Sequence, residues 1–211
     1  MKKLTAAALF LSLALSTSAQ FEGVLMYDCT IKNKTLTTIY ESKTKVLLEA
    51  KIYPMKAGIA DIKEAKEQDP ILFDFETKKA TRVGARHHEV ATSALAPVTN
   101  DRNDKAKEDE INVTLVGEER IEPYKCQHFT IKIKNTTVDL WITKELGASE
   151  VVLLSQFDYY PAGSILFEKL KAAGGEGVVV RSKEGDIVVN LTNAQVKTVP
   201  ASYFDIPGVK P

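Results

Sequence analysis

The sequence predicts an α+β protein dominated by one large antiparallel sheet, and three observations support this. Apolar residues recur with period two along most of the chain, which is typical of strands with one buried face. One segment, residues 164–173, carries the signals of a helix. Strands and helices do not alternate in the order that a parallel sheet requires. We therefore expect about ten strands and one main helix.

The first 19 residues form the pattern of a secretory signal peptide. They open with two lysines, continue with an almost unbroken apolar run and end in small residues, which predicts cleavage between Ala19 and Gln20. The apolar run is shorter than the roughly 20 residues of a membrane-spanning helix. A cysteine that could carry a lipid anchor is missing near the cleavage site. We therefore expect a soluble protein of the periplasm or of the secreted fraction, from a Gram-negative bacterium, with residues 20–211 as a single β-rich domain.

Length and charge exclude several classes of partner. Without the first 19 residues the chain has 192 residues of its 211, with 26 basic against 28 acidic side chains, a formal charge of −2. This length suffices for a sizeable core. A nearly neutral chain with interspersed signs does not predict binding to nucleic acid or to an anionic membrane surface. The sequence contains no Gly-x-Ser-x-Gly nucleophile elbow, no His-Glu-x-x-His zinc-binding helix and no glycine-rich phosphate-binding loop. We therefore expect no catalysis, cofactor or metal.

The first part of this chain predicts an antiparallel meander. Residues 21–32 place Leu25, Tyr27 and Cys29 on one face. A turn at Asn33-Lys34 leads to a second strand at 35–42, and a third strand follows near residue 45. Short connections between consecutive strands are typical of antiparallel pairing.

The middle of the chain is less regular. Residues 54–69 contain Pro54 and Gly58 and then predict a short, charged, helical stretch. Strand signals return at 71–76 and at 80–84. Residues 86–110 are rich in Asp, Asn, Lys and Glu, and we expect them to form a long, loosely ordered polar loop.

Residues 126–144 carry the strongest hairpin signal. With Asn135-Thr136 as a two-residue turn, three apolar pairs are predicted: Phe129 with Ile142, Ile131 with Leu140, and Ile133 with Val138. The same register predicts three pairs on the other face: Lys132 with Asp139, Thr130 with Trp141, and His128 with Thr143. The six apolar residues are our candidate ligand-binding face, since a shift by one residue would turn them all to the wrong side.

The last part of the chain predicts a helix and two more strands. Ser164 is a suitable N-cap for the helix, and Gly174-Gly175 would end it. Strands are predicted at 178–182 and 187–193, joined by a polar turn. We expect the apolar segment 203–207 to dock on the sheet.

Two cysteines, Cys29 and Cys126, allow one disulfide in an exported protein. Cys29 has the apolar parity of its strand, whereas Cys126 has the parity of His128 and Trp141. Strand parity therefore places the thiols on opposite faces and disfavours a bridge. A bulge at Pro123 would turn the Cys126 side chain to the other face, so a Cys29–Cys126 disulfide remains the alternative.

Several stretches resemble a family of uncharacterised secreted bacterial proteins. They are Gly117-Glu-Glu-Arg-Ile-Glu-Pro-Tyr-Lys-Cys126, Val138-Asp-Leu-Trp-Ile-Thr-Lys-Glu-Leu-Gly147, Phe73-Asp-Phe-Glu-Thr-Lys-Lys79 and Phe204-Asp-Ile-Pro207. The fold of that family is similar to lipoprotein carriers of the LolA and LolB type. The resemblance implies a large curved antiparallel sheet, an incomplete barrel, wrapped around one main helix and enclosing an apolar concave face.

Two functions from different classes follow. The resemblance implies a binding or carrier module whose concave face holds a hydrophobic or lipid-like small molecule or an acylated protein. The alternative is a sensor or protein-interaction module of the cell envelope, in which the helix fills the barrel and no ligand binds. An apolar cavity needs more inward apolar residues than the helix covers, and the pattern leaves both hypotheses open, together with the oligomeric state.

Overall fold

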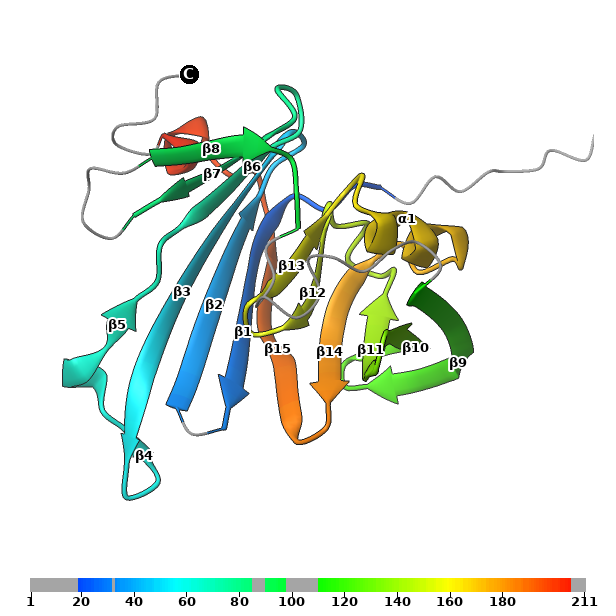
Figure 1. Ribbon diagram of the computed structural model, residues 1–211, viewed down its shortest axis with the longest axis horizontal. Coiled ribbons are helices and arrows are strands. Elements are labelled where there is room, and N and C mark those ends of the chain that lie inside the picture. Colours follow the sequence, from blue (N-terminus) through cyan, green and yellow to red (C-terminus); the bar gives the residue numbers. More distant parts are fainter. Residues whose placement is uncertain (1–18, 32, 85–89, 98–109, 206–211) are drawn as a thin grey trace, which may run out of the picture.

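The computed structural model describes residues 19–31, 33–84, 90–97 and 110–205. In these residues an unclosed antiparallel sheet of 13 strands curves around a separate two-stranded hairpin and one short helix, as Figure 1 shows. The strands of the large sheet are β1 (Gly23–Thr30), β2 (Asn33–Glu41), β3 (Lys45–Lys56), β4 (Ile59–Ala60), β5 (Lys66–Glu67), β6 (Ile71–Asp74), β7 (Lys79–Val83), β8 (Val90–Ala94), β9 (Ile111–Ile121), β10 (Tyr124–Ile133), β11 (Thr136–Thr143), β14 (Val178–Glu184) and β15 (Ile187–Val196).

The strand order is β8-β7-β6-β3-β2-β1-β15-β14-β11-β10-β9, and the short strands β4 and β5 pair with β3. The remaining elements are β12 (Val151–Ser155), β13 (Asp158–Pro161), α1 (Ile165–Ala172) and the 3-10 helices η1 (Ile62–Glu64) and η3 (Ala201–Phe204). The predicted fold class, a large open antiparallel sheet with one α-helix among the described residues, is confirmed.

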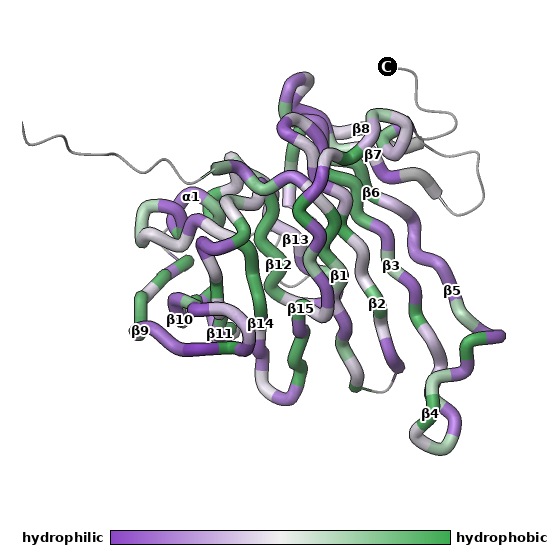
Figure 2. Tube along the Cα trace, turned by 180° about the vertical axis from the view of Figure 1, so that it is seen from behind, coloured by the Kyte–Doolittle hydropathy of each residue, from purple (hydrophilic) through white to green (hydrophobic). Residues whose placement is uncertain are grey.

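The N-terminal meander is confirmed, but its first turn lies earlier than predicted. Hydrophobic and hydrophilic stretches follow one another along β1, β2 and β3 in Figure 2, with apolar runs at Val24-Leu25-Met26 and Val46-Leu47-Leu48. β1 and β2 pair in one constant register from Gly23–Glu41 to Thr30–Lys34. Asn33 and Lys34 are therefore strand residues, and the prediction of a turn there is wrong.

Residues 54–69 form a β-strand extension instead of a helical stretch. β3 continues to Lys56, and Ala57 and Gly58 turn the chain with positive φ angles of 49° and 80°. Only the 3-10 turn η1 is helical, capped by the Asp61 carboxylate, which accepts a hydrogen bond from the Lys63 amide at 3.1 Å.

The predicted polar loop at 86–110 contains a strand. β8 pairs with β7 in an antiparallel register from Val83–Val90 to Lys79–Ala94, so the loop prediction is wrong for these residues. The Thr81 and Thr92 hydroxyls approach to 3.3 Å across the pair, the kind of cross-strand contact that stabilises a polar edge strand. Residues 86–89 and 98–109 of this prediction lie outside the described residues.

The hairpin β10–β11 is present, with a register two residues away from the predicted one. Its turn is Lys134-Asn135, with Lys134 at a φ of 52°. The observed pairs are Ile133 with Thr136, Lys132 with Thr137, Ile131 with Val138, Thr130 with Asp139, Phe129 with Leu140, His128 with Trp141, and Gln127 with Ile142. Because strand side chains alternate with period two, a shift by two residues leaves every side chain on its predicted face.

The hairpin β12–β13 fills the interior of the curved sheet, and the sequence analysis does not predict it. Every residue of both strands is buried. Val151, Leu153 and Tyr159 pack into a first core cluster with β1, β2, β3 and β6. The alternate residues, Val152, Leu154 and Tyr160, pack into a second core cluster with β10, β11 and α1. The hairpin is therefore packed between two halves of the sheet: a first half with β1, β2, β3 and β6, and a second half with β10 and β11.

The sheet curves around the helix as predicted, but the helix shares the interior with the hairpin β12–β13. α1 begins at its N-cap Ser164 as predicted, and the Ser164 hydroxyl accepts a hydrogen bond from the Phe167 amide at 3.4 Å. Its buried residues, Leu166 and Leu170, contact the second core cluster only. A helix of eight residues is too short to cover both halves, so the hairpin fills the remainder.

The C-terminal segment docks on the sheet as predicted, on its convex face, and residues 206 and 207 of the predicted segment lie outside the described residues. Phe204 in η3 is buried with Val24, Leu47 and Leu72. Tyr203 packs on Tyr40 with ring centroids 5.0 Å apart.

Among the described residues, helices long and apolar enough to cross a membrane are not found.

Candidate ligand-binding site

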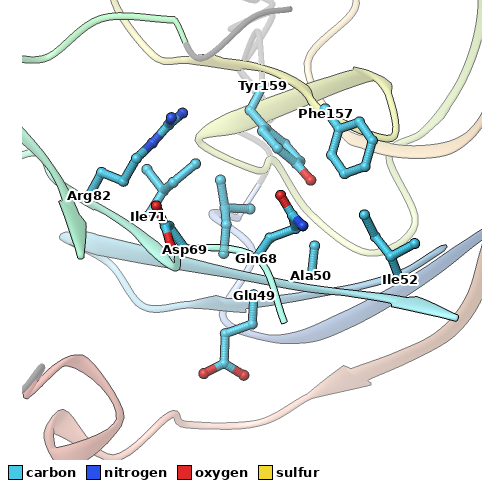
Figure 3. Close-up of a pocket in the computed structure, with 10 residues that line it drawn as sticks. Glu49, Ala50, Ile52, Gln68, Asp69, Ile71, Arg82, Phe157 and Tyr159 are labelled. Carbon is cyan, nitrogen blue, oxygen red and sulfur yellow. The ribbon is translucent and has the colours of Figure 1, made fainter. Parts of the chain in front are cut away.

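A pocket of about 300 Å³ lies between β3, β6 and β7 and the tip of the interior hairpin, as Figure 3 shows. It exists because the hairpin covers only part of the first half of the sheet. Its floor comes from alternate residues of β3, namely Leu48, Ala50 and Ile52, with Ile71 of β6 beside them. Glu49 lies between these positions, and its side chain points to the other side of the sheet. The floor is therefore apolar.

The roof of the pocket is aromatic. Phe157 lies in the turn between β12 and β13, and Tyr159 follows in β13. The Tyr159 hydroxyl donates a hydrogen bond to the Gln156 carbonyl oxygen at 2.8 Å. Burial raises the pKa of Tyr159 to about 12, so this phenol stays neutral at physiological pH. The roof offers aromatic surface, and Tyr159 is unsuited to act as a base.

Asp69 and Arg82 lie at one end of the pocket, and the Gln68 side chain lies nearer the middle, between Ala50 and Tyr159 (Figure 3). Gln68, Asp69 and Arg82 contribute to its lining. The Gln68 amide nitrogen of the backbone donates to the Ala50 carbonyl oxygen at 2.8 Å, which holds this segment against β3. Arg82 comes from β7, opposite Ile71 of β6. A pocket with an apolar floor, an aromatic roof and a polar end suits a small molecule with an apolar body and a hydrogen-bonding group.

The predicted apolar face lies on the concave side, where the hairpin and helix cover it. Each of its six residues is at most 1% exposed: Phe129, Ile131, Ile133, Val138, Leu140 and Ile142. They all belong to the second core cluster. A ligand would reach them only after the hairpin or helix had moved, so their role in binding stays a prediction.

The two cysteines are free thiols in different clusters. Cys29 belongs to the first core cluster on the concave side. Cys126 is buried with Trp141 on the opposite face of the sheet. This is the arrangement that strand parity predicts. Burial raises the pKa of both thiols, which makes them less reactive.

A polar and aromatic row crosses the convex face of β10, β11 and β14. The His128 ring stacks on Trp141, with centroids 4.5 Å apart and planes 9° from parallel. The guanidinium of Arg181 lies 5.9 Å from the centre of the Trp141 ring. His128 Nε2 lies 3.1 Å from Asp139 Oδ1, which also accepts from the Thr130 hydroxyl at 2.8 Å. Because the rings and polar atoms have partners within the row, we interpret it as structural.

A metal site is not found among the described residues: they contain no group of three or more His, Cys, Asp or Glu side chains placed to hold an ion. His87 and His88, the adjacent histidines of the sequence, lie outside the described residues.

Sequence reasoning missed the residues that make the pocket. One signal for its roof is present: the run Val151-Val-Leu-Leu154 is apolar without alternation, which is typical of a strand buried on both sides. Nothing local indicates that residues near 50 and near 158 come together, since more than a hundred positions separate them.

The architecture is that of an unclosed β-sheet half-barrel with a filled interior and a pocket at one end. A family model described as a domain of unknown function, DUF4412, matches residues 21–208. The chain therefore belongs to the DUF4412 family. Comparison with the curated proteins finds no match.

Similar solved structures include PNGF-II, at 15% identity and a TM-score of 0.45 over 86% of this chain. The chain spans only 29% of the length of PNGF-II. An uncharacterized conserved protein from Thermus thermophilus has 9% identity and a TM-score of 0.44, covering 89% of this chain and 84% of that one. A DUF1329 family protein from Desulfovibrio piger has 11% identity and a TM-score of 0.26, covering 88% of each chain. Similarities this distant carry no functional argument, and the resemblance to lipoprotein carriers stays a prediction.

Proposed function

We propose that this protein is a non-enzymatic binding module for a small amphipathic molecule, and that the ligand occupies the pocket between β3 and the tip of the interior hairpin. One observation supports this most: the pocket is open beside the hairpin, whereas the six residues of the predicted apolar face are buried by other side chains. Its volume, about 300 Å³, is at the lower end of the range in which proteins hold small ligands.

The shape and chemistry of the pocket support a ligand with an apolar body. Ala50, Ile52 and Phe157 would contact the apolar part from below and above. Gln68 and Arg82 would contact a hydrogen-bonding group. Removing apolar surface from water would supply most of the affinity, at roughly 25 cal/mol per Å² of buried area.

A second candidate is a protein-interaction module of the cell envelope without a ligand. The filled interior favours it, because the six predicted ligand-contacting residues are covered by the hairpin and the helix.

We also propose that the protein works in the periplasm or in the secreted fraction. The pattern of residues 1–19 supports export. The N-terminal sequence of the protein recovered from the periplasm tests this, with Gln20 as the expected first residue and an intact Met1 as the contradicting result.

The binding proposal is tested with a matched pair of tryptophan substitutions. Ala50→Trp places an indole into the pocket from its floor, whereas Lys51→Trp places the same side chain on the other face of β3. A fluorescent fatty acid is titrated into the wild-type protein and both variants, and extracts of the purified wild-type protein are analysed by mass spectrometry.

We expect the wild-type protein and Lys51→Trp to bind the probe, and Ala50→Trp to lose at least tenfold in affinity. Circular dichroism confirms that both variants fold. A wild-type protein that is reproducibly empty and does not bind the probe would contradict the proposal and favour the interaction module. Equal affinities of the two variants would place the ligand elsewhere.

A further inference from the structure

Glu41, the last residue of β2, is a fully buried carboxyl group at the base of the interior hairpin. It connects the sheet to the segment in which β12 begins. Its Oε1 accepts a hydrogen bond from the Glu150 amide at 2.7 Å, and its Oε2 lies 2.7 Å from the Ser149 hydroxyl. Ion pairs of Glu41 are not found among the described residues.

The hydrogen bonds around Ser149 indicate where a proton lies. The Ser149 hydroxyl oxygen is 3.1 Å from the Val151 carbonyl oxygen and accepts from the Val151 amide at 3.2 Å. Val151 and Pro161 form a non-hydrogen-bonded pair, since the Ala162 amide donates to the Glu150 carbonyl oxygen at 2.8 Å, so the Val151 carbonyl points away from β13 and receives no hydrogen bond from that strand. The Ser149 hydroxyl has one hydrogen and two oxygen neighbours that need one, Glu41 Oε2 and Val151 O.

A neutral Glu41 satisfies every one of these groups. If Glu41 Oε2 carries a proton, it donates to Ser149, and the Ser149 hydrogen is free to reach the Val151 carbonyl. If Glu41 is ionised, the Ser149 hydrogen is drawn to the carboxylate, and the Val151 carbonyl loses its donor. The buried negative charge would then have two donors and no cation beside it, which is unfavourable in a fully buried position.

We propose that protonated Glu41, through Ser149, is a pH-sensitive latch that holds the base of the interior hairpin against the sheet, and that loss of this proton releases the hairpin. The latch is independent of whether the pocket binds a ligand. It affects the pocket all the same, because the tip of the same hairpin carries Phe157 and Tyr159 of the roof.

Neighbouring titratable groups favour the neutral form. The Tyr27 hydroxyl of β1 donates to the Val179 carbonyl oxygen at 2.9 Å, and as a phenol it supplies no positive charge that would stabilise an ionised Glu41. Glu150, at the start of the hairpin, would repel a charged Glu41. The further charges around Glu150 are Glu168 and Lys171 of α1, and Glu176, which pairs with Lys171 at 3.2 Å.

The latch weakens as pH rises. Burial raises the pKa of Glu41 from 4.5 to about 8, so Glu41 keeps its proton while the hairpin is closed and loses it to water when release of the hairpin exposes the carboxyl group. Proton binding is thus stronger in the closed state, and closure is favoured at low pH. Between about pH 5 and pH 7.5 the equilibrium constant for opening should rise about tenfold per pH unit, levelling off above pH 8.

Native-state hydrogen exchange from pH 5 to pH 9 measures this opening, after correction for the intrinsic exchange rate. We expect the protection of the β12 and β13 amides to fall with pH, and above pH 8 to be lower than the protection of β10 and β11. In Glu41→Gln, which is neutral at every pH, the protection of the hairpin should change less than threefold over the range. Glu150→Gln is the matched control: because Glu150 favours neutral Glu41, this variant should keep a slope of the same sign, displaced to lower pH.

Three results would overturn the latch: a wild-type slope in Glu41→Gln, no slope in the wild-type protein, or equal protection of the hairpin and of β10–β11 at every pH. A measurement on the wild-type protein tests the latch without requiring that the Glu41→Gln variant folds. Carbon-detected nuclear magnetic resonance of the Glu41 carboxyl group should show it protonated at pH 6 and titrating above pH 7. An ionised Glu41 at pH 6 would contradict the proposal directly, whatever the result of the ligand titration.

Discussion

The hairpin β12–β13 is the element on which the interior depends, and Leu153→Ala is the perturbation that measures its contribution. Leu153 is 1% exposed and belongs to the first core cluster. Truncation of fully buried leucines destabilises proteins by about 2.7–5.0 kcal/mol, because transfer free energy is lost and a cavity remains. Leu153 has neighbours from both the sheet and its own hairpin, so we expect a loss of about 3–4 kcal/mol.

The free energy of unfolding is measured by urea denaturation at pH 6. The expected loss corresponds to a decrease of roughly 6–16 °C in the melting temperature for a chain of this size. Leu154→Ala makes the same truncation on the other side of the strand, in the second core cluster, and should be similarly destabilising. Leu115→Ala, at a residue that is 47% exposed, is the control and should change stability by less than about 0.5 kcal/mol. A loss in Leu153→Ala as small as that of the control would refute the packing of the hairpin between the two halves.

Three further predictions concern the protonated carboxyl, the helix and the cysteines. Because the pKa of Glu41 is raised to about 8, the stability that its protonated form contributes is fully present below about pH 4.5 and is lost as pH rises through 8. The free energy of unfolding of Glu41→Gln, measured by urea denaturation, should therefore depend less on pH than that of the wild-type protein. Ser164→Ala removes the acceptor of the Phe167 amide and should reduce the unfolding free energy by about 1 kcal/mol, whereas an unchanged value would show that the cap is dispensable. Cys29 and Cys126 should both react with a thiol reagent in denaturant and only slowly in the native protein, and a denatured protein without reactive thiols would demonstrate a disulfide.

The sequence predicts most of the large sheet because its strands have one buried and one polar face. Leu25, Tyr27 and Cys29 follow this rule, and so do the residues of β10 and β11. The exact partners in the hairpin β10–β11 were wrong by two residues, since a turn at Lys134-Asn135 and one at Asn135-Thr136 place the same side chains on the same faces. Periodicity determines faces, and the turn determines register.

The interior could not be predicted in the same way. Val151 to Leu154 contact both halves of the sheet, so the segment has no polar face and no period. Local sequence patterns do not predict the candidate pocket either, because Ala50 and Tyr159 come together only when the whole hairpin packs against the sheet. The proton on Glu41 depends on a contact between residues 108 positions apart, which a single sequence does not reveal.

The central claim is that a ligand binds in the pocket beside β3 while the rest of the concave face stays filled. Mapping of amide chemical shifts during titration with a fatty acid tests this most directly, at pH 6 where the latch is closed. We expect the amide chemical shifts of residues 48–52 and 157–159 to change and those of the β10 and β11 amides to stay the same. Shifts centred on residues 129–133 and 138–142 would show that the ligand displaces the hairpin, and would contradict it.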